Sequence, residues 1–152
     1  MASTLDLASS TRLAGRGVVT PAALGATLLR VSLGVMWISH ALLKLLVFTL
    51  PGTAQFFESV GFWGWLAYPV FAAELTGGLM LVLGIYARQV SLALVPVMLA
   101  AASVHMGNGW VFTSAGGGWE YPVFLAVASV VVWLVGDGAF SLKRSGEEIA
   151  RF

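Results

Sequence analysis

Four long apolar runs constrain what this chain can fold into more than any other feature of its sequence. They extend from about Ala22 to Phe48, Ala67 to Tyr86, Val90 to Met106 and Tyr121 to Val135. At ~1.5 Å per residue, the first run as a helix exceeds the ~30 Å hydrocarbon core of a bilayer. Only 10% of the 152 residues are charged, whereas a soluble domain carries about a quarter. The sequence therefore predicts an all-α membrane protein, a four-transmembrane-helix bundle.

The segments between and around the runs set the predicted domain boundaries. Gln55 to Trp65 is aromatic, broken by glycines and too short to span, which favours an interfacial or re-entrant segment between helices 1 and 2. We expect a cytoplasmic tail over residues 1–20, the transmembrane domain over 21–138, and a second cytoplasmic tail over 139–152. From Phe140 to Phe152 the charge pattern predicts a weakly amphipathic helix.

The charges predict orientation and exclude several kinds of function. Seven cations fall at one end of an up-down-up-down bundle and only Lys44 at the other; the seven are Arg12, Arg16, Arg30, Arg88, Lys143, Arg144 and Arg151. Under the positive-inside rule, both termini of this multi-pass plasma-membrane protein are cytoplasmic. A net charge of +1 gives no reason to expect nucleic acid. The absence of cysteine excludes disulfides and Cys-ligated metal or iron–sulfur centres.

The first apolar run carries a polar stripe. Arg30, Trp37 and Lys44 are seven residues apart, and Gly34 and His40 lie three or four residues from them. These positions share one face of a helix. A polar stripe facing lipid would be unpaired, so this face is predicted to look inward at other helices.

The topology brings polar residues from all four runs into one layer near the outer surface. The candidate catalytic residues are His40, Lys44, Glu74, His105 and Glu120, and the candidate cofactor-binding residues are Trp37, His40, His105, Asn108 and Tyr121. Ionisable residues inside a membrane are costly unless they have partners, so they indicate a functional site.

Two chemistries fit such a layer. The carbonyls of a quinone head group need donors, and its reduction needs protons that histidine and glutamate can relay. Haem ligation by His40 and His105 is less favoured, as is a metal site drawn from His40, Glu74, His105 and Glu120, because no HxxxH or ExxH spacing is present.

Structural interpretations compete with each functional one. Lys44 and Glu74 are most simply a buried ion pair that joins two helices. The histidines can hydrogen-bond within the bundle. Glu120 at a helix start is stabilised by the helix dipole, and the glycines at 116–118 form either a flexible turn or a loop that folds over a ligand.

With these motifs, the chain resembles the DoxX family of small bacterial membrane proteins. The matching segments are LLRVSLGVMWISHALLKL, AAELTGGLMLVLGIYAR, HMGNGWVF and GGGWEYP leading into GDGAFSLK, in this order from about Leu29 to Arg144. The family is similar to the small membrane subunit of a thiosulfate:quinone oxidoreductase. Carried over by position, its motif residues here are Arg30, His40, Lys44, Glu74, Arg88, His105, Asn108, Glu120 and Tyr121.

We therefore expect the membrane subunit of an oxidoreductase system, which binds a quinone-like or other small redox ligand near the outer leaflet. Its partners are expected to be the lipid bilayer and either a redox-complex protein or further copies of itself. A non-enzymatic anchor or assembly subunit is the alternative, and a small-molecule transporter is the third, disfavoured by four short spans without an inverted repeat.

Overall fold

The computed structural model describes residues 19–146, so residues 1–18 of the predicted N-terminal tail and residues 147–152 of the predicted C-terminal tail lie outside the described range. Within this range the regular structure is helical apart from one isolated bridge between Ile85 and Lys143. The elements are α2 (Pro21–Leu42), η1 (Leu43–Val47), α3 (Leu50–Ser59), η2 (Gly64–Leu66), α4 (Ala67–Leu83), α5 (Ala87–His105), η3 (Met106–Asn108) and α6 (Glu120–Val135).

The first helix starts where its sequence places a cap. The Thr20 hydroxyl accepts a hydrogen bond from the Ala23 backbone N–H at 3.2 Å, and Pro21 occupies the first turn, where its missing N–H does no harm. α2 continues without a break into η1, which is a π-helix. Such widened turns are rare and occur mostly at functional sites. This one contains Lys44.

The aromatic segment after the first span contains more regular structure than its sequence predicted. α3 begins at Leu50, with Thr49 as the cap whose hydroxyl accepts from the Gly52 N–H at 3.2 Å. The short 3₁₀ turn η2 then leads directly into α4. Its interfacial or re-entrant placement in the membrane stays a prediction.

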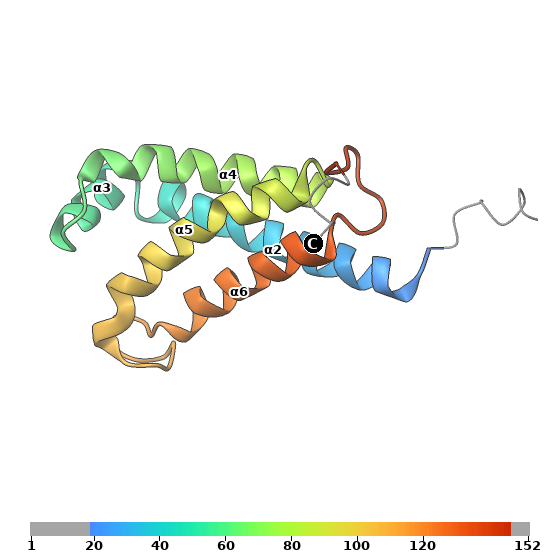
Figure 1. The fold of residues 1–152 in the computed structure, drawn as a ribbon. Helices are drawn as coiled ribbons and strands as arrows, with labels where there is room; N and C mark the ends of the chain where they lie inside the picture. Colours follow the sequence, from blue (N-terminus) through green and yellow to red (C-terminus); the bar gives the residue numbers. More distant parts are fainter. Residues whose placement is uncertain (1–18, 147–152) are drawn as a thin grey trace, which may run out of the picture.

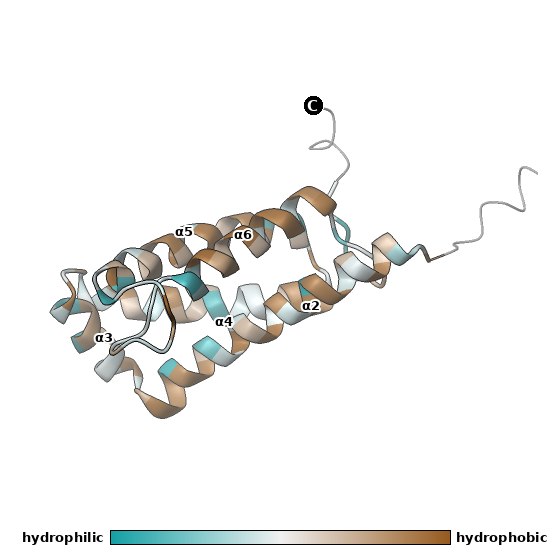
Figure 2. Cartoon of the chain, turned by 90° about the horizontal axis from the view of Figure 1, so that it is seen from below, coloured by the Kyte–Doolittle hydropathy of each residue, from teal (hydrophilic) through white to brown (hydrophobic). Residues whose placement is uncertain are grey.

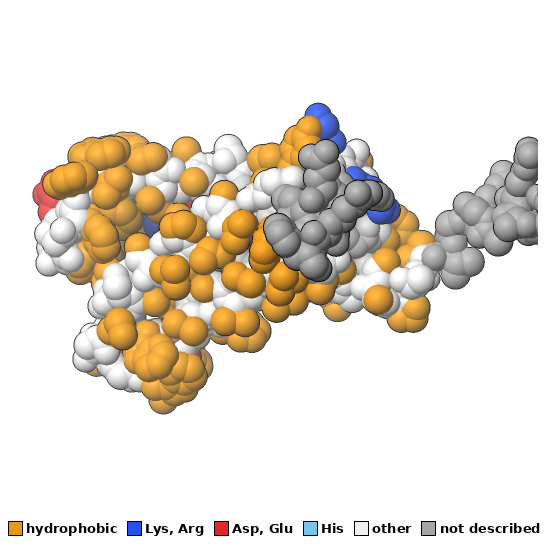
Figure 3. All heavy atoms as spheres, viewed as in Figure 1, with side chains coloured by type: hydrophobic (Ala, Val, Ile, Leu, Met, Phe, Trp, Pro, Cys, Tyr) orange, Lys and Arg blue, Asp and Glu red, His pale blue; other side chains and the backbone are white. Residues whose placement is uncertain are grey.

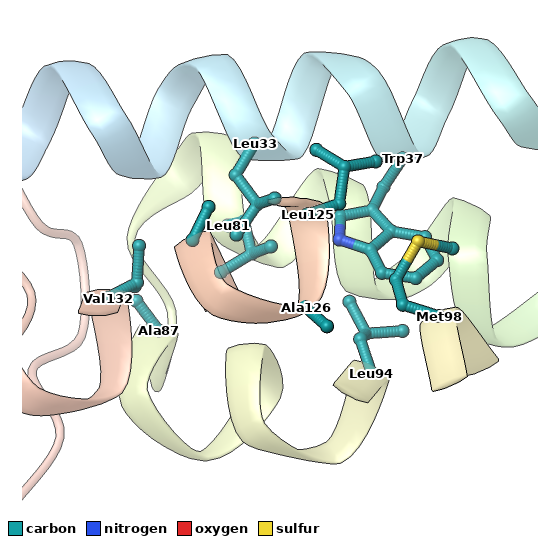
Figure 4. Packing of buried hydrophobic residues seen from close by; sticks show 10 residues of the cluster. Leu33, Trp37, Leu81, Ala87, Leu94, Met98, Leu125, Ala126 and Val132 are labelled. Atoms are coloured by element: carbon teal, nitrogen blue, oxygen red, sulfur yellow. The ribbon is translucent and has the colours of Figure 1, made fainter. Parts of the chain in front are cut away.

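The helices form a four-helix bundle (Figure 1). α2 packs chiefly against α4, and α5 against α6, while smaller interfaces join α4 to α5 and α2 to α6. One end of the bundle carries α3 and the 106–119 loop. The other carries the start of α2 and residues 136–146. The core lies between the helices (Figure 4) and is formed by Leu33, Trp37, Leu81, Ala87, Leu94, Met98, Leu125, Ala126, Ala128 and Val132.

The outer surface of the bundle is suited to lipid. Within residues 19–146, three helical stretches are long and apolar enough to cross a membrane: Pro21–Val47, Gly64–Leu83 and Ala87–Asn108; α6 is apolar but shorter. Hydrophobic residues predominate along the helices (Figure 2), and hydrophobic side chains are spread over the face of the bundle that Figure 3 shows. Leu28, Leu46 and Leu134 are among many exposed apolar residues. We conclude that this is a multi-pass membrane protein.

Arg30 joins three parts of the bundle at the end opposite α3. Its guanidinium donates to the carbonyl oxygens of Leu81 and Val82 in α4, and to that of Ala139 at 3.3 Å. The last carbonyls of a helix have no partner within the helix, so Arg30 satisfies the end of α4. Arg30 forms no salt bridge with Asp137, whose carboxylate accepts from the Ser145 N–H and hydroxyl, both at 2.7 Å.

The segment after α6 is irregular where it is described, with one isolated bridge. The Lys143 N–H donates to the Gly84 carbonyl at 3.0 Å, and the Tyr86 N–H donates to the Lys143 carbonyl at 2.9 Å. These bonds account for the bridge between Ile85 and Lys143. The predicted helix from Phe140 is therefore wrong over residues 140–146. The rest of that prediction lies outside the described residues.

Candidate functional site

An ion pair between two membrane helices is the centre of the candidate site. The Lys44 ammonium lies 2.9 Å from Oε1 and 2.8 Å from Oε2 of Glu74. Glu74 lies on α4 with 2% of its side chain exposed, and Lys44 lies in the π-helical turn with 17% exposed. The predicted pairing is confirmed. An ammonium has three donors, so the pair leaves Lys44 one N–H for another acceptor.

His40 lies one turn before Lys44 and contacts the start of α6. Its ring stacks on that of Tyr121, with the centroids 5.8 Å apart and the planes inclined by 20°. Nδ1 lies 2.8 Å from the Met36 carbonyl oxygen, and because a carbonyl only accepts, Nδ1 carries a hydrogen. In the neutral ring, Nε2 is then an acceptor. His40 therefore lies one helical turn from the Lys44–Glu74 pair.

Tyr121 contributes a hydroxyl that the fold does not use. This oxygen is buried and has no hydrogen-bond partner among residues 19–146. A buried polar atom without a partner costs about 1–3 kcal/mol, so its presence calls for an explanation. A ligand that accepts or donates one hydrogen bond here would satisfy it.

Trp37 belongs to the core, not to an open site. Its side chain is 2% exposed and lies between the helices with Leu94 and Met98 (Figure 4). Its indole N–H is also buried without an acceptor among the described residues. The structure therefore places this predicted cofactor-binding residue in the hydrophobic core of the bundle and not on the wall of a cavity.

The other predicted site residues organise the loop between α5 and α6. His105 Nδ1 and the Asn108 amide both donate to the Gly116 carbonyl at 3.0 Å. Glu120 Oε1 accepts from the Phe112 N–H at 2.8 Å. The loop is therefore fastened at both helices. His40 and His105 make separate sets of contacts, one inside the bundle and one in this loop.

A cavity of about 460 Å³ lies between this loop and α6. Its walls are formed by Trp110, Phe112, Glu120, Tyr121, Val123, Phe124 and Val127. The volume is within the ~300–1,000 Å³ range of small-molecule sites. Tyr121 connects it to the polar layer, because its ring lines the cavity and stacks on His40. Sequence reasoning missed the aromatic walls, although the tryptophan and phenylalanine residues of the loop were a signal for them.

The four candidate metal ligands do not converge. Within residues 19–146, no group of three histidine, aspartate or glutamate side chains is arranged to hold a metal ion. His40 and Glu74 belong to the bundle interior, whereas His105 and Glu120 bind backbone groups of the loop.

The fold and the site together define a class of protein: a small helical membrane protein with a charged pair and an aromatic cavity at one end. The comparison with protein families gives a particular family. The DoxX family matches residues 25–107, and the chain belongs to this family. The matched region includes His40, Lys44, Glu74 and His105 but ends before Glu120 and Tyr121.

A curated relative from Bacillus subtilis (strain 168) carries the name "Putative oxidoreductase CatD". It is 35% identical to this chain over 127 residues, which cover 78% of this chain and 84% of the relative. No solved structure matches the chain. The family and this relative support an oxidoreductase-associated membrane subunit.

Proposed function

We propose that this chain is the membrane subunit of an oxidoreductase system, and that it binds a quinone-like head group beside Tyr121, in the polar layer that also contains His40 and Lys44. The carrying observation is the Tyr121 hydroxyl, which is buried without a partner among residues 19–146 while its ring lines an aromatic cavity and stacks on His40. Family membership and the named relative support the oxidoreductase class.

The donors and acceptors match both forms of such a ligand. A bound quinone supplies redox chemistry by taking up two electrons and two protons. Tyr121 donates to one carbonyl, and the remaining Lys44 N–H is available to an acceptor nearby. Nε2 of neutral His40 accepts a hydrogen bond and, when protonated, carries a proton beside Glu74. Electrons come from a partner protein, because the chain has no cysteine and no cysteine-ligated redox centre.

The same proposal includes the placement in the membrane. α6 is a fourth span. It is short because it starts at Glu120, after the glycine-rich loop, at a depth below the membrane surface. α3 lies at the interface. The site faces the outer leaflet of the plasma membrane with both termini in the cytoplasm, as the distribution of cations supports. Two single variants, Ser114→Cys and Ser141→Cys, test this placement with a membrane-impermeant thiol reagent added outside the cell. The Ser114→Cys variant should be labelled and the Ser141→Cys variant should not.

Ligand binding is tested directly with the full chain in nanodiscs free of endogenous quinone. A short-chain quinone is titrated in, and heat or tryptophan quenching is recorded. We expect saturable binding that Tyr121→Phe weakens about tenfold, the size of one hydrogen bond lost. Tyr68→Phe is the matched control, because Tyr68 is 49% exposed. An absence of saturable binding, or an equal loss in both variants, contradicts the proposal.

An anchoring subunit is the second candidate. Trp63 and Trp65 stack at 6.1 Å while 71% and 60% exposed, at the end that carries α3. Such a pair suits either the headgroup region or a partner protein. A double variant, His40→Ala with His105→Ala, separates the two functions: assembly that persists while turnover stops contradicts the anchoring role.

A further inference from the structure

A second cavity lies at the opposite end of the bundle, between the first turns of α2 and the end of α6. Its volume is about 1130 Å³. Ala22, Ala26 and Leu29 form one apolar wall, and Val131 and Val135 form the other. Alanine and glycine residues at positions 22, 23, 25 and 26 of α2 leave the space between these walls unfilled.

Two arginines line the same cavity. Arg88 is the second residue of α5, and Arg144 lies in the irregular segment after α6. The Arg88 guanidinium makes no hydrogen bond or salt bridge with residues 19–146, and its Nε is buried. Its Nη1 would lie 3.7 Å from a side-chain carbon placed at Gly136, so the absence of a side chain there keeps it uncovered.

The local charge balance is positive. Asp137 is the acidic residue of the lining, but both of its oxygens accept bonds from Ser145. The Ser145 hydroxyl in turn accepts from the Arg88 backbone N–H at 3.2 Å. Asp137 therefore offsets one arginine and leaves one excess positive charge, next to the positive N-terminal end of α5. Cations gather at this end of the molecule (Figure 3).

From these observations we infer that the cavity is a binding site for an anionic phospholipid. The acyl chain lies between the apolar walls of α2 and α6, and the phosphate accepts hydrogen bonds from Arg88 and Arg144. Arginine binds phosphate through two parallel N–H groups, and basic pockets between membrane helices bind anionic headgroups. This site is at the other end of the bundle from Tyr121 and is independent of the proposed function.

The test uses the full chain in detergent and native mass spectrometry. Phosphatidylglycerol and phosphatidylcholine with identical acyl chains are added separately, and retained lipid is counted. Both lipids offer a phosphate to the arginines, but the choline cation of phosphatidylcholine is repelled by the excess positive charge of the site. We therefore expect about tenfold tighter retention of phosphatidylglycerol. Arg88→Gln should remove most of this preference. Lys143→Gln is the matched control, because its ammonium lies over the Tyr86 ring and does not line the cavity.

A second variant, which fills the cavity, keeps the test valid if Arg88→Gln fails to fold. Gly25 lines the cavity, and a side-chain carbon placed there meets nothing within 4 Å. Gly25→Phe should fold, fill the space and reduce retention of both lipids. Equal retention of the two lipids by the unchanged protein overturns the inference, as does an equal loss in Lys143→Gln. Competition by inorganic phosphate at millimolar concentration would assign the site to free phosphate and also overturn it.

The acidic residues that follow the described range provide the last arm. The double variant Glu147→Gln with Glu148→Gln tests whether the two arginines pair with these carboxylates. Phosphatidylglycerol binding that appears in this variant and is missing from the unchanged chain would show such pairing. That result overturns the lipid site. Unchanged binding in this double variant supports it.

Discussion

Gly34 in α2 and Gly78 in α4 face each other across a close contact between the two helices. A side-chain carbon at Gly34 would lie 2.8 Å from the Gly78 carbonyl oxygen, and one at Gly78 would lie 2.9 Å from that of Gly34. Small residues at such positions let membrane helices approach backbone to backbone. This contact sets the spacing at which Lys44 of η1 reaches Glu74 of α4.

Gly34→Ala should therefore destabilise the bundle, by about 1–3 kcal/mol as expected for overpacking. The measurement is the free energy of unfolding in mixed dodecyl maltoside and SDS micelles. Gly25→Ala is the matched control on the same helix, where an added carbon meets nothing within 4 Å. It should be neutral or stabilise the helix by up to about 1 kcal/mol. Equal stability of the two variants would show that the close approach is unimportant.

Lys44→Met should cost about 3–5 kcal/mol of stability, because it leaves the Glu74 carboxylate buried without its cation. The double variant Lys44→Met with Glu74→Leu should recover most of this loss, since both charges are then removed. Unfolding of the single and double variants measures the coupling between the two sites. Independent, additive effects would contradict an energetic role for the 2.8 Å contact.

Tyr121→Phe should have opposite effects on stability and on ligand binding. Removing a buried hydroxyl that lacks a partner among the described residues should raise the free energy of unfolding by about 1 kcal/mol. Quinone affinity should fall in the same variant. A loss of stability would mean that the hydroxyl already has a partner, which would leave the proposed site without its donor.

Arg30→Gln should loosen the end of the bundle opposite α3. It removes charge-assisted bonds to the α4 carbonyls of Leu81 and Val82 and to Ala139, with a cost of about 3 kcal/mol or more. Hydrogen exchange should accelerate at residues 82–85 and 139–143. Arg30→Lys should recover part of the protection, because one ammonium cannot reach all three carbonyls. Faster exchange confined to the 106–119 loop would contradict this account.

Apolar periodicity was sufficient to predict the four long helices and the buried face of the first one. The predicted first span, Ala22 to Phe48, matches α2 with η1 at Pro21–Val47, and the predicted stripe places Arg30, Gly34 and Trp37 inside the bundle. The Lys44–Glu74 pair followed from the same reasoning, because two opposite charges on inward faces have few other partners.

The contacts made through backbone groups were not predictable. Arg30 binds carbonyls, and nothing in its sequence neighbourhood distinguishes them from the Asp137 carboxylate. The stacking of His40 on Tyr121 depends on how α2 crosses α6, which helical spacing within one element does not determine. α3 was missed because glycine and aromatic residues obscured the cap at Thr49.

The Lys44–Glu74 pair also bears on how the protein is made. Each charge alone opposes transfer of its helix from the translocation machinery into lipid, and the two residues are 30 positions apart in the chain. We therefore expect α2 to remain in the translocation machinery until α4 has been synthesised. The two segments then enter the lipid together as a helical hairpin whose charges are neutralised.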